Sequence, residues 1–261
     1  HVLKDDKTIY KLYVWEDIIG KEVTFTDKEK LNIPVVIMAG GKGSRLKPLT
    51  NIIPKALVPV GEKPIIEIII DNFSKIGIDQ FFLSVNYKHE MIKQYFDHLK
   101  PSNYSLKYIK EDKPLGTAGS LYLLKDKIHS TFFVSNCDIL IEQDFREVYR
   151  YHKQNNNELT IISALKQYSI PYGTIVTKKN GILDRMEEKP ELTFQVNTGM
   201  YILEPHLLNE IPKNELFHIT SLIENIRKRD GKVGVFPISE KSWIDIGVWK
   251  SYQESIENFK P

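Results

Sequence analysis

The sequence predicts an α/β fold with a mixed, mostly parallel sheet flanked by helices and extra antiparallel strands in its second half. In the first half, short apolar β-type runs alternate with amphipathic helical segments, which is typical of a parallel sheet. In the second half, the pair Asn180-Gly181 between two strand-like segments indicates a hairpin. The chain has 261 residues and is 41% hydrophobic, so it can bury one main core.

The first half alternates regularly between strands and helices. Its expected strands are 35–39, 81–85, 106–109 and 131–135, and its expected helices are 64–76, 89–99, 118–124 and 145–154. The first strand is a run of five apolar residues with two adjacent valines, which suits a strand buried on both faces. We therefore expect a doubly wound α/β arrangement here.

The second half changes character and should contain more antiparallel pairing. Its expected strands are 159–165, 195–203 and 233–236, and its expected helices are 218–229 and 248–259. Residues 1–32 fit neither the α/β pattern nor a disordered composition. We therefore expect residues 1–32 to be a linker or the remnant of an upstream module, and residues 33–261 to form the main domain.

Composition excludes several classes of partner. The formal net charge is only +2, so the chain lacks the global basic field that grips nucleic acid. No apolar run approaches the roughly 20 residues needed to span a bilayer. Cys137 is the only cysteine, which excludes an internal disulfide and suits a reducing, cytoplasmic setting. We expect a small-molecule partner, with no nucleic acid and no membrane.

A glycine-rich loop, "GGKGSRLKPLT", follows the first strand directly. Ligands of open α/β sheets bind at the carboxyl ends of strands, and glycines there let backbone N–H groups approach an anion. Lys42, Arg45, Lys47 and Lys55 add positive charge. The loop is therefore a candidate polyphosphate cradle, and the alternative is a tight surface turn with solvated lysines.

Two familiar phosphate-binding patterns do not fit this loop. A Walker loop needs Gly-Lys-Ser/Thr at its end, but Gly43 is followed by Ser44-Arg45. A dinucleotide fingerprint needs a small residue three positions after Gly43, where Leu46 stands. The second mismatch also weakens a nicotinamide-dependent oxidoreductase as an interpretation.

The loop, with "PKALVPV" after it, resembles the signature of the sugar-nucleotidyltransferases, the NDP-sugar pyrophosphorylases. The resemblance continues in the family's order through "PLGTAGS", "NCDIL", "PYGTIV", "EEKP", "VNTGMYIL" and "WIDIG", from about residue 33 to 259. It implies the Rossmann-like, GT-A-like fold of nucleotide-diphospho-sugar transferases. It also implies a reaction in which a sugar 1-phosphate attacks the α-phosphorus of a nucleoside triphosphate (NTP) and releases pyrophosphate.

Site residues carry over from this resemblance motif by motif. The expected catalytic cations are Arg45, Lys55 and Lys189, and the expected magnesium ligands are Asp138 and Asp245. The expected nucleotide-binding residues are Ala39, Gly40, Gly41, Gly43, Ser44, Glu111, Gly116 and Thr117. The expected sugar contacts are Gly173, Glu188, Asn197 and Thr198. Each has a plain structural alternative, such as a capping aspartate, a solvated turn lysine or an Asn/Thr pair that satisfies a neighbouring strand edge.

Glu111 points to guanine as the base. By the resemblance it falls near the base, and an ionised carboxylate only accepts hydrogen bonds, which suits the adjacent N1–H and N2–H₂ donors of guanine. The alternative is an exposed glutamate at a strand end. GTP is therefore the favoured NTP, and the sequence leaves the sugar open. Many relatives have glycine directly before the metal aspartate, whereas Cys137 stands here, and we expect that thiol to pack as a small buried group.

Two further expectations come from the resemblance. The sequences of several motifs are most similar to those of guanylyltransferases of this family that carry paired CBS modules ahead of the transferase, so residues 1–32 would be the linker. Related enzymes often form dimers or tetramers, which makes a homo-oligomer an open alternative to a monomer. A different class of function, a catalytically weak sugar-nucleotide-binding regulatory module of the same fold, is disfavoured because Arg45, Lys55, Asp138, Lys189 and Asp245 are all present.

Overall fold

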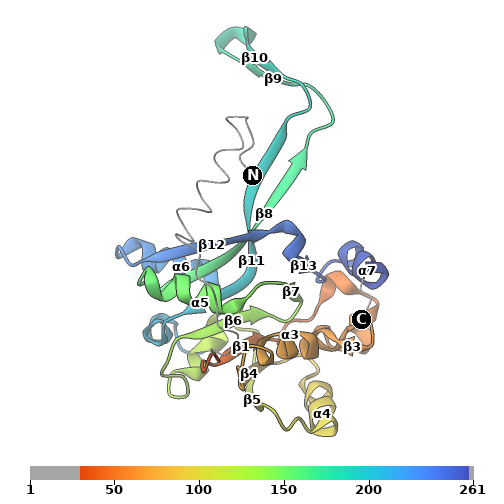
Figure 1. The fold of residues 1–261 in the computed structure, drawn as a ribbon, viewed down its shortest axis with the longest axis vertical. Helices are drawn as coiled ribbons and strands as arrows, with labels where there is room; N and C mark the ends of the chain where they lie inside the picture. Colours follow the sequence, from red (N-terminus) through yellow and green to blue (C-terminus); the bar gives the residue numbers. More distant parts are fainter. Residues whose placement is uncertain (1–29, 259–261) are drawn as a thin grey trace.

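A computed structural model describes residues 30–258, and the expected linker or CBS remnant therefore lies almost wholly outside the described residues. A seven-stranded sheet forms the centre of the molecule (Figure 1). Its strands, in spatial order, are β12 (Val233–Ser239), β8 (Leu159–Ser169), β11 (Glu191–Leu203), β6 (Phe132–Asn136), β1 (Val35–Met38), β4 (Gln80–Val85) and β5 (Ser105–Lys110). All neighbours pair in parallel except β11, which is antiparallel to both β6 and β8. The predicted fold class is confirmed.

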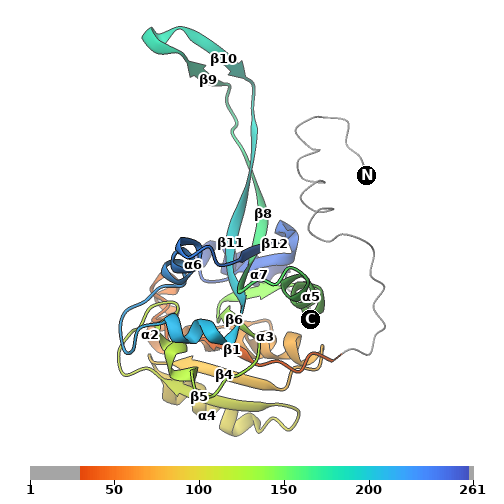
Figure 2. The same cartoon turned by 90° about the vertical axis from the view of Figure 1, so that its left-hand side faces the viewer.

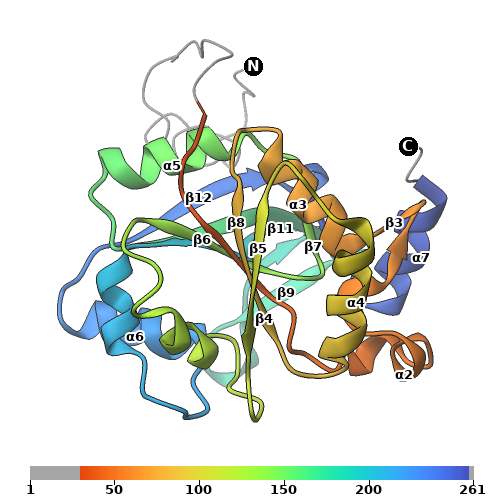
Figure 3. The ribbon, with the colours of Figure 1, turned by 90° about the horizontal axis from the view of Figure 1, so that it is seen from below.

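Helices cover both faces of the sheet because successive strand residues point to opposite sides. Val35 and Ile37 of β1 pack into one core with α3 (Ile65–Ser74), α4 (His89–Leu99) and α5 (Phe145–Gln154). Val36 packs into a second core with α6 (Ile219–Lys228), η3 (Gly119–Leu124) and η5 (Pro205–Glu210). Figure 3 shows α3 and α4 on one side of the strands and α6 on the other. The buried apolar run of β1 is thus explained by a core on each face.

Most expected elements appear within a few residues of their predicted bounds, and two match at both ends. The helices expected at 89–99 and 145–154 are α4 and α5, and Asp144 begins α5 by accepting a hydrogen bond from the Arg146 N–H. The segment expected as a helix at 118–124 is the 3₁₀ helix η3. Short helical elements also occur within and after the glycine loop: η1 (Ser44–Leu46), α2 (Leu49–Ile52) and η2 (Lys55–Leu57).

The largest departure from the sequence-based expectation is an arm that rises from the body of the protein. Strands β8 and β11 continue well past the residues predicted for them, and between them β9 (Thr174–Thr177) and β10 (Leu183–Glu187) form a hairpin. Figures 1 and 2 show this hairpin at the far end of the arm. The predicted turn at Asn180-Gly181 is confirmed, and both residues have positive φ. Because β8 runs parallel to β6 and β1, the arm leaves from the carboxyl-end edge of the sheet.

Several smaller elements lie outside the main sheet and its covering helices. Two short sheets flank the main one, formed by β2 (Pro59–Val60) with β3 (Lys63–Pro64) and by β7 (Ile139–Ile141) with β13 (Trp243–Asp245). The helical turn η6 (Glu240–Ser242) and helix α7 (Trp249–Asn258) lie on either side of β13 in the chain. No helix within residues 30–258 has the length and apolar character that crossing a membrane requires.

Candidate active site

A pocket of about 350 Å³ opens where β1 and β6 end side by side. Eight of the predicted site residues line it, namely Gly40, Gly41, Arg45, Lys55, Glu111, Gly116, Thr117 and Asp138. Strands β1 and β6 are parallel neighbours, so the loops after them meet at one edge of the sheet, where ligands of such sheets bind. A larger hollow of about 890 Å³ lies at the opposite, amino-terminal edge around residues 74–79 and holds none of the predicted residues.

The glycine loop is shaped by close contacts at two of its glycines. A Cβ at Gly40 would stand 2.7 Å from Oε1 of Glu111, and one at Gly43, where φ is +64°, would stand 2.8 Å from Thr50. The Thr50 hydroxyl also donates a hydrogen bond of 2.8 Å to the Gly43 carbonyl, which fixes the turn. At Gly41 no atom lies within 4 Å of a Cβ position. Gly41 therefore presents open backbone to the pocket, as a phosphate cradle requires.

The other loop residues differ in which hydrogen-bonding groups are free to contact a ligand. The Ala39 N–H already donates to the Ser84 carbonyl at 2.7 Å, so its predicted nucleotide contact would have to use another atom. Ser44 and Arg45 are exposed on η1, and Arg45 lines the pocket. A guanidinium there can form paired hydrogen bonds with phosphate oxygens.

Two aspartates that are distant in sequence meet beside this loop. Strand β13 pairs with β7 so that Asp245 lies opposite Ile139, and the Ile246 N–H donates to the Asp138 carbonyl at 3.0 Å. The tight neighbour of both is Gly247: a Cβ there would stand 2.0 Å from Asp138 Oδ2 and 2.9 Å from Asp245 Oδ1. The small β7–β13 sheet thus brings Asp245 beside Asp138, which lines the pocket, so that both predicted metal ligands meet at one corner next to it.

Lys55 is ion-paired with Asp138 in this corner. Asp138 is almost fully buried, with 5% of its surface exposed, and burying a charged group is costly unless it is paired. The donor set, two carboxylates open to further oxygen ligands from a substrate phosphate or water, is of the kind that Mg²⁺ takes in proteins. The residues present therefore fit the predicted ion.

Glu111 is buried in the pocket wall. It is therefore not the exposed glutamate at a strand end that was the alternative interpretation. The Ser84 hydroxyl donates to its Oε1 at 2.6 Å, and the Leu115 N–H donates to its Oε2 at 3.1 Å. Asn86 donates to its backbone carbonyl at 2.7 Å. Each carboxylate oxygen retains a second acceptor position, so Glu111 is a fixed acceptor in the wall of the pocket.

Gly116 and Thr117 connect the pocket wall to α6. A Cβ at Gly116, where φ is +81°, would stand 2.6 Å from the Phe217 carbonyl. The Thr117 hydroxyl accepts a hydrogen bond of 3.0 Å from the Ile219 N–H at the start of α6. Both residues therefore line the pocket and also hold α6 in place.

Asn197 and Thr198 lie at an irregularity of β11, next to the end of β6. Asn197 donates to the Tyr201 hydroxyl at 2.7 Å and accepts from the Gly199 N–H at 3.0 Å. The Thr198 hydroxyl is buried, donating to the Ile162 carbonyl at 2.7 Å and accepting from the Met200 N–H at 3.3 Å. The Thr198 hydroxyl thus serves the sheet, whereas the exposed Asn197 remains the better placed for a ligand.

Gly173, Glu188 and Lys189 are not brought together with the other predicted residues. All three lie on the arm, on either side of the β9–β10 hairpin (Figure 1). They do lie near one another, because a Cβ at Gly173 would stand 2.9 Å from Oε2 of Glu188. Within one chain, the structure separates this group from the pocket that holds Asp138.

Cys137 packs as the sequence predicts. Its thiol is buried, and burial raises the pKa of that thiol to about 12. Sequence reasoning missed Gly247, Ser84 and Thr50, which position predicted site residues: Gly247 packs against Asp138 and Asp245, Ser84 holds Glu111, and Thr50 holds Gly43. Gly247 follows Asp245 by two positions in "WIDIG". This glycine next to a predicted metal ligand could have indicated a tightly packed position.

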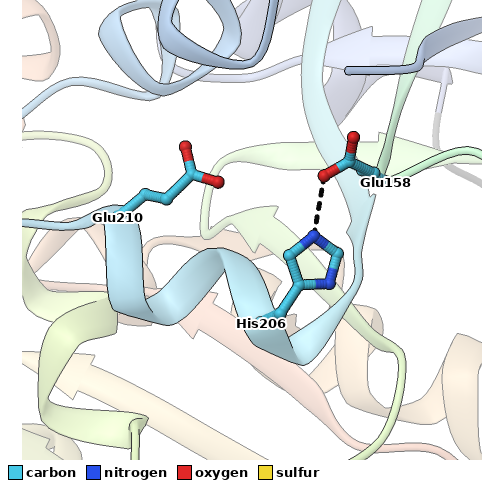
Figure 4. A group of neighbouring side chains, drawn as sticks. All are labelled: Glu158, His206 and Glu210. Atoms are coloured by element: carbon cyan, nitrogen blue, oxygen red, sulfur yellow. Dashed lines mark hydrogen bonds and ion pairs between the residues drawn. The ribbon is translucent and has the colours of Figure 1, made fainter. Parts of the chain in front are cut away.

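A second cluster of metal-type ligands consists of Glu158, His206 and Glu210 (Figure 4), none of which lines this pocket. His206 is 2.7 Å from Glu158, and Arg229 donates to Glu158 at 2.9 and 2.6 Å and to Glu210 at 2.5 Å. The pKa of Glu158 is lowered to about 2, mainly by the hydrogen bonds from the Arg229 guanidinium. The Arg229 guanidinium already balances the charge of these carboxylates. The cluster is therefore an ion-pair network that links the start of β8, η5 and the end of α6.

Comparison with known proteins gives a consistent family. The model of the family described as "Nucleotidyl transferase" matches residues 34–260. A mannose-1-phosphate guanyltransferase of Schizosaccharomyces pombe is 34% identical over 228 residues, which cover 83% of this chain and 61% of that protein. One of Aspergillus oryzae is 33% identical, with the same coverage of each chain. The chain therefore spans about 61% of the length of these curated relatives.

Solved structures show the same fold. The crystal structure of HddC from Yersinia pseudotuberculosis superposes with a TM-score of 0.69 at 28% identity, covering 87% of this chain and all of that one. A second structure of HddC, in complex with GMP-PN, gives a TM-score of 0.68 at 27% identity, with the same coverage of both chains.

Proposed function

Because this chain belongs to the nucleotidyl transferase family, we propose that it couples a sugar 1-phosphate to an NTP, with GTP favoured, and produces an NDP-sugar and pyrophosphate. The observation that carries the proposal is the convergence of Lys55, Asp138 and Asp245 beside the glycine-loop pocket. The guanyltransferases among its relatives and the GMP-PN complex of HddC support GTP. Mannose 1-phosphate is the first sugar phosphate to test, because the curated relatives are named for it.

The reaction asks the protein for position and charge. A phosphate oxygen of the sugar 1-phosphate forms a bond to the α-phosphorus, the bond from that phosphorus to the bridging oxygen breaks, and pyrophosphate leaves with its electron pair. The attacking phosphate is already a nucleophile, so no serine, cysteine or histidine is needed. Arg45 and the open backbone at Gly41 would hold the triphosphate, and Lys55 would offset negative charge near the reacting phosphorus.

Magnesium would be held by Asp138 and Asp245. When bound, the ion would neutralise phosphate charge and help align the two anions. Lys55, ion-paired with Asp138, fixes the orientation of that carboxylate before any ligand arrives. Titration with Mg²⁺ tests the roles of both aspartates, and we expect weaker binding of the ion in Asp138→Asn.

Glu111 would select the base. Its carboxylate is buried at the pocket wall and held on both oxygens by Ser84 and Leu115. A fixed acceptor of this kind can accept hydrogen bonds from the paired N–H donors of guanine, whereas the base edge of adenine matches it poorly.

A CBS-linked arrangement and a homo-oligomer, which follow from the family resemblance, and a cytoplasmic location, which follows from the single cysteine, are further proposals.

The test is a substrate panel. The protein is mixed with Mg²⁺, each of the common NTPs and a set of sugar 1-phosphates, and pyrophosphate release is measured. We expect release with GTP and one sugar phosphate, and its loss in Asp138→Asn. If every pair is silent while nucleotide still binds, the regulatory binding module replaces the transferase as the better account.

A further inference from the structure

The arm, residues 166–195, exposes an unusual amount of apolar surface. Of the fifteen exposed large hydrophobic residues among those the structure describes, nine lie on this arm. They include Tyr168, Tyr172, Ile175, Ile182, Met186 and Phe194, whose exposed fractions range from 47% to 74%. Apolar surface gathered in one place at this density marks an interaction site.

The arm is a stiff continuation of the body. Pairing between β8 and β11 runs without a shift from Asn197↔Ser163 at the body to Glu191↔Ser169 on the arm. Folding the arm back onto its own pocket would break this ladder. On the arm, the outer edges of residues 166–169 of β8 and 191–195 of β11 pair with no other described strand, and a two-stranded ribbon with open edges is marginally stable alone in water. The arm needs a surface on which to lie, and its own body is out of reach.

The body carries a patch suited to receive it. Val248 and Trp249 are 37% and 40% exposed, and they follow Gly247, the residue against Asp138 and Asp245. One chain thus presents both an apolar arm and an apolar patch at the rim of its pocket. If two copies exchange arms, the arm of each copy covers the apolar patch of the other, and the assembly closes as a symmetric dimer.

The polar residues of the arm point to its role at that rim. Glu188 and Lys189 are exposed, and neither forms an ion pair with another described residue. Lys189 precedes Asn197 by eight residues, most of them in β11, a stretch of roughly 26 Å at 3.3 Å per residue, which removes Lys189 from its own pocket. That pocket must hold two phosphorylated reactants, while Lys55 is already paired with Asp138. The other cation that lines the described pocket, Arg45, is assigned to the triphosphate, so the sugar phosphate is left without a cation, and a partner's arm can bring one.

We propose that the protein is an arm-exchanged dimer in which residues 166–195 of each copy dock on Val248 and Trp249 of the other and supply Glu188 and Lys189 to its pocket. This inference rests on the proposed transferase function for the role of Lys189, but the dimer itself does not depend on it. Each active site is then built from two chains: the glycine loop, Lys55 and both aspartates from one, and the sugar-side residues from the other.

Mixed dimers test the exchange directly. Two differently tagged chains are co-expressed and purified over both tags in sequence, so that only mixed pairs are assayed. In the first pair, one chain carries Asp138→Asn and the other Lys189→Ala. Exchange of arms leaves one intact site in two, so we expect about half the pyrophosphate release of the tagged wild-type dimer. With sites built within one chain, the same pair would be inactive.

The matched control places both substitutions on one chain and pairs it with wild type. Exchanged arms then leave no intact site, whereas sites within one chain leave one. Half activity in the first pair and none in the control supports the proposal, and the reverse pattern overturns it. Failure to recover any mixed pair on the second tag also overturns it.

A measurement of mass keeps the dimer testable if no substrate is found. Light scattering after size exclusion should give twice the chain mass for the wild type, and the chain mass for a Tyr172→Ser, Ile175→Ser, Met186→Ser variant that retains its circular dichroism. A wild type that elutes at the chain mass overturns the exchange. A dimer without pyrophosphate release would instead count against the transferase alone.

Discussion

Asp245 lies opposite Ile139, the residue after Asp138, so that two carboxylates from distant parts of the chain share one corner of the pocket. Gly247 fills the narrow space beside them. This relationship depends on two strands of three residues each, β7 and β13, and it makes the corner sensitive to added volume.

Gly247→Ala should therefore impair catalysis without unfolding the protein. The added methyl would stand 2.0 Å from Asp138 Oδ2, 2.9 Å from Asp245 Oδ1 and 3.0 Å from Lys55 Nζ, so these groups must move. Displacement of reacting groups by about 1 Å can reduce a rate on the order of 100-fold. We expect a loss of that size in pyrophosphate release at saturating substrate, with the thermal midpoint little changed. A variant with wild-type rate would show that the corner is not where charge is neutralised.

Lys55→Met should destabilise the protein through Asp138. Side-chain exposures of 15% and 7% place the pair largely out of water, and removing one partner of a buried pair leaves an uncompensated charge that costs about 3 kcal/mol. We expect the free energy of unfolding in urea to fall by about that amount. Adding Asp138→Asn to the same chain should recover part of the loss, because the amide carries no charge. If the double variant is less stable than Lys55→Met, the pair is not the source of the effect.

Glu111→Gln should weaken the preference for GTP over ATP. The amide NH₂ of glutamine would meet the donors of Ser84 or Leu115, which both donate to the carboxylate. The carboxylate acceptor that we propose for the base is also lost. A lost buried hydrogen bond of about 1.4 kcal/mol corresponds to a tenfold change. We expect the ratio of kcat/KM for GTP over ATP to fall by about that factor, with some loss of thermal stability.

Ser84→Ala is the control for Glu111→Gln. It removes one donor to the same carboxylate but leaves the acceptor in place. It should lower thermal stability and retain most of the nucleotide preference. An unchanged ratio in Glu111→Gln would remove the argument for guanine.

His152 should make stability depend on pH below neutrality. Its ring is fully buried between Thr160 at 2.8 Å and Glu204 at 3.2 Å, and Lys153 lies on the same carboxylate. Burial, the dominant cause, lowers the pKa of His152 below its ordinary 6.5. The unfolded chain therefore binds a proton more readily than the folded one, so this stabilisation is complete above pH 6.5 and is lost as the pH falls through and below that value.

Thermal unfolding across pH 7.5 to 5 measures this contribution. We expect the midpoint to fall with pH in the wild type and to fall less in His152→Gln. His98→Gln, at an exposed position on α4, should follow the wild-type slope. Equal slopes in all three proteins would assign the pH dependence to other groups.

Several features of the fold and the site could be read from the sequence because they depend on local chemistry. The apolar run 35–38, the helices 89–99 and 145–154 and the turn at Asn180-Gly181 each follow from periodicity or from turn residues. The glycine loop could be placed at the carboxyl-end edge of the sheet because ligands of open α/β sheets bind where the strands end. The 3₁₀ geometry of η3 was not predicted, because its apolar spacing suits both kinds of helix.

The tertiary structure alone decided where the two halves of the site lie. Sequence motifs list Asp138, Lys189 and Asp245 in chain order, but only the β7–β13 pairing joins the two aspartates. Only the β8–β11 ladder, which is unshifted from Asn197 to Glu191, carries Lys189 away from them. The sequence determined which groups the protein can use, since side-chain chemistry is local. Their distances depend on the register of strands that are remote in the chain, and register is fixed by packing and hydrogen bonds across the whole sheet.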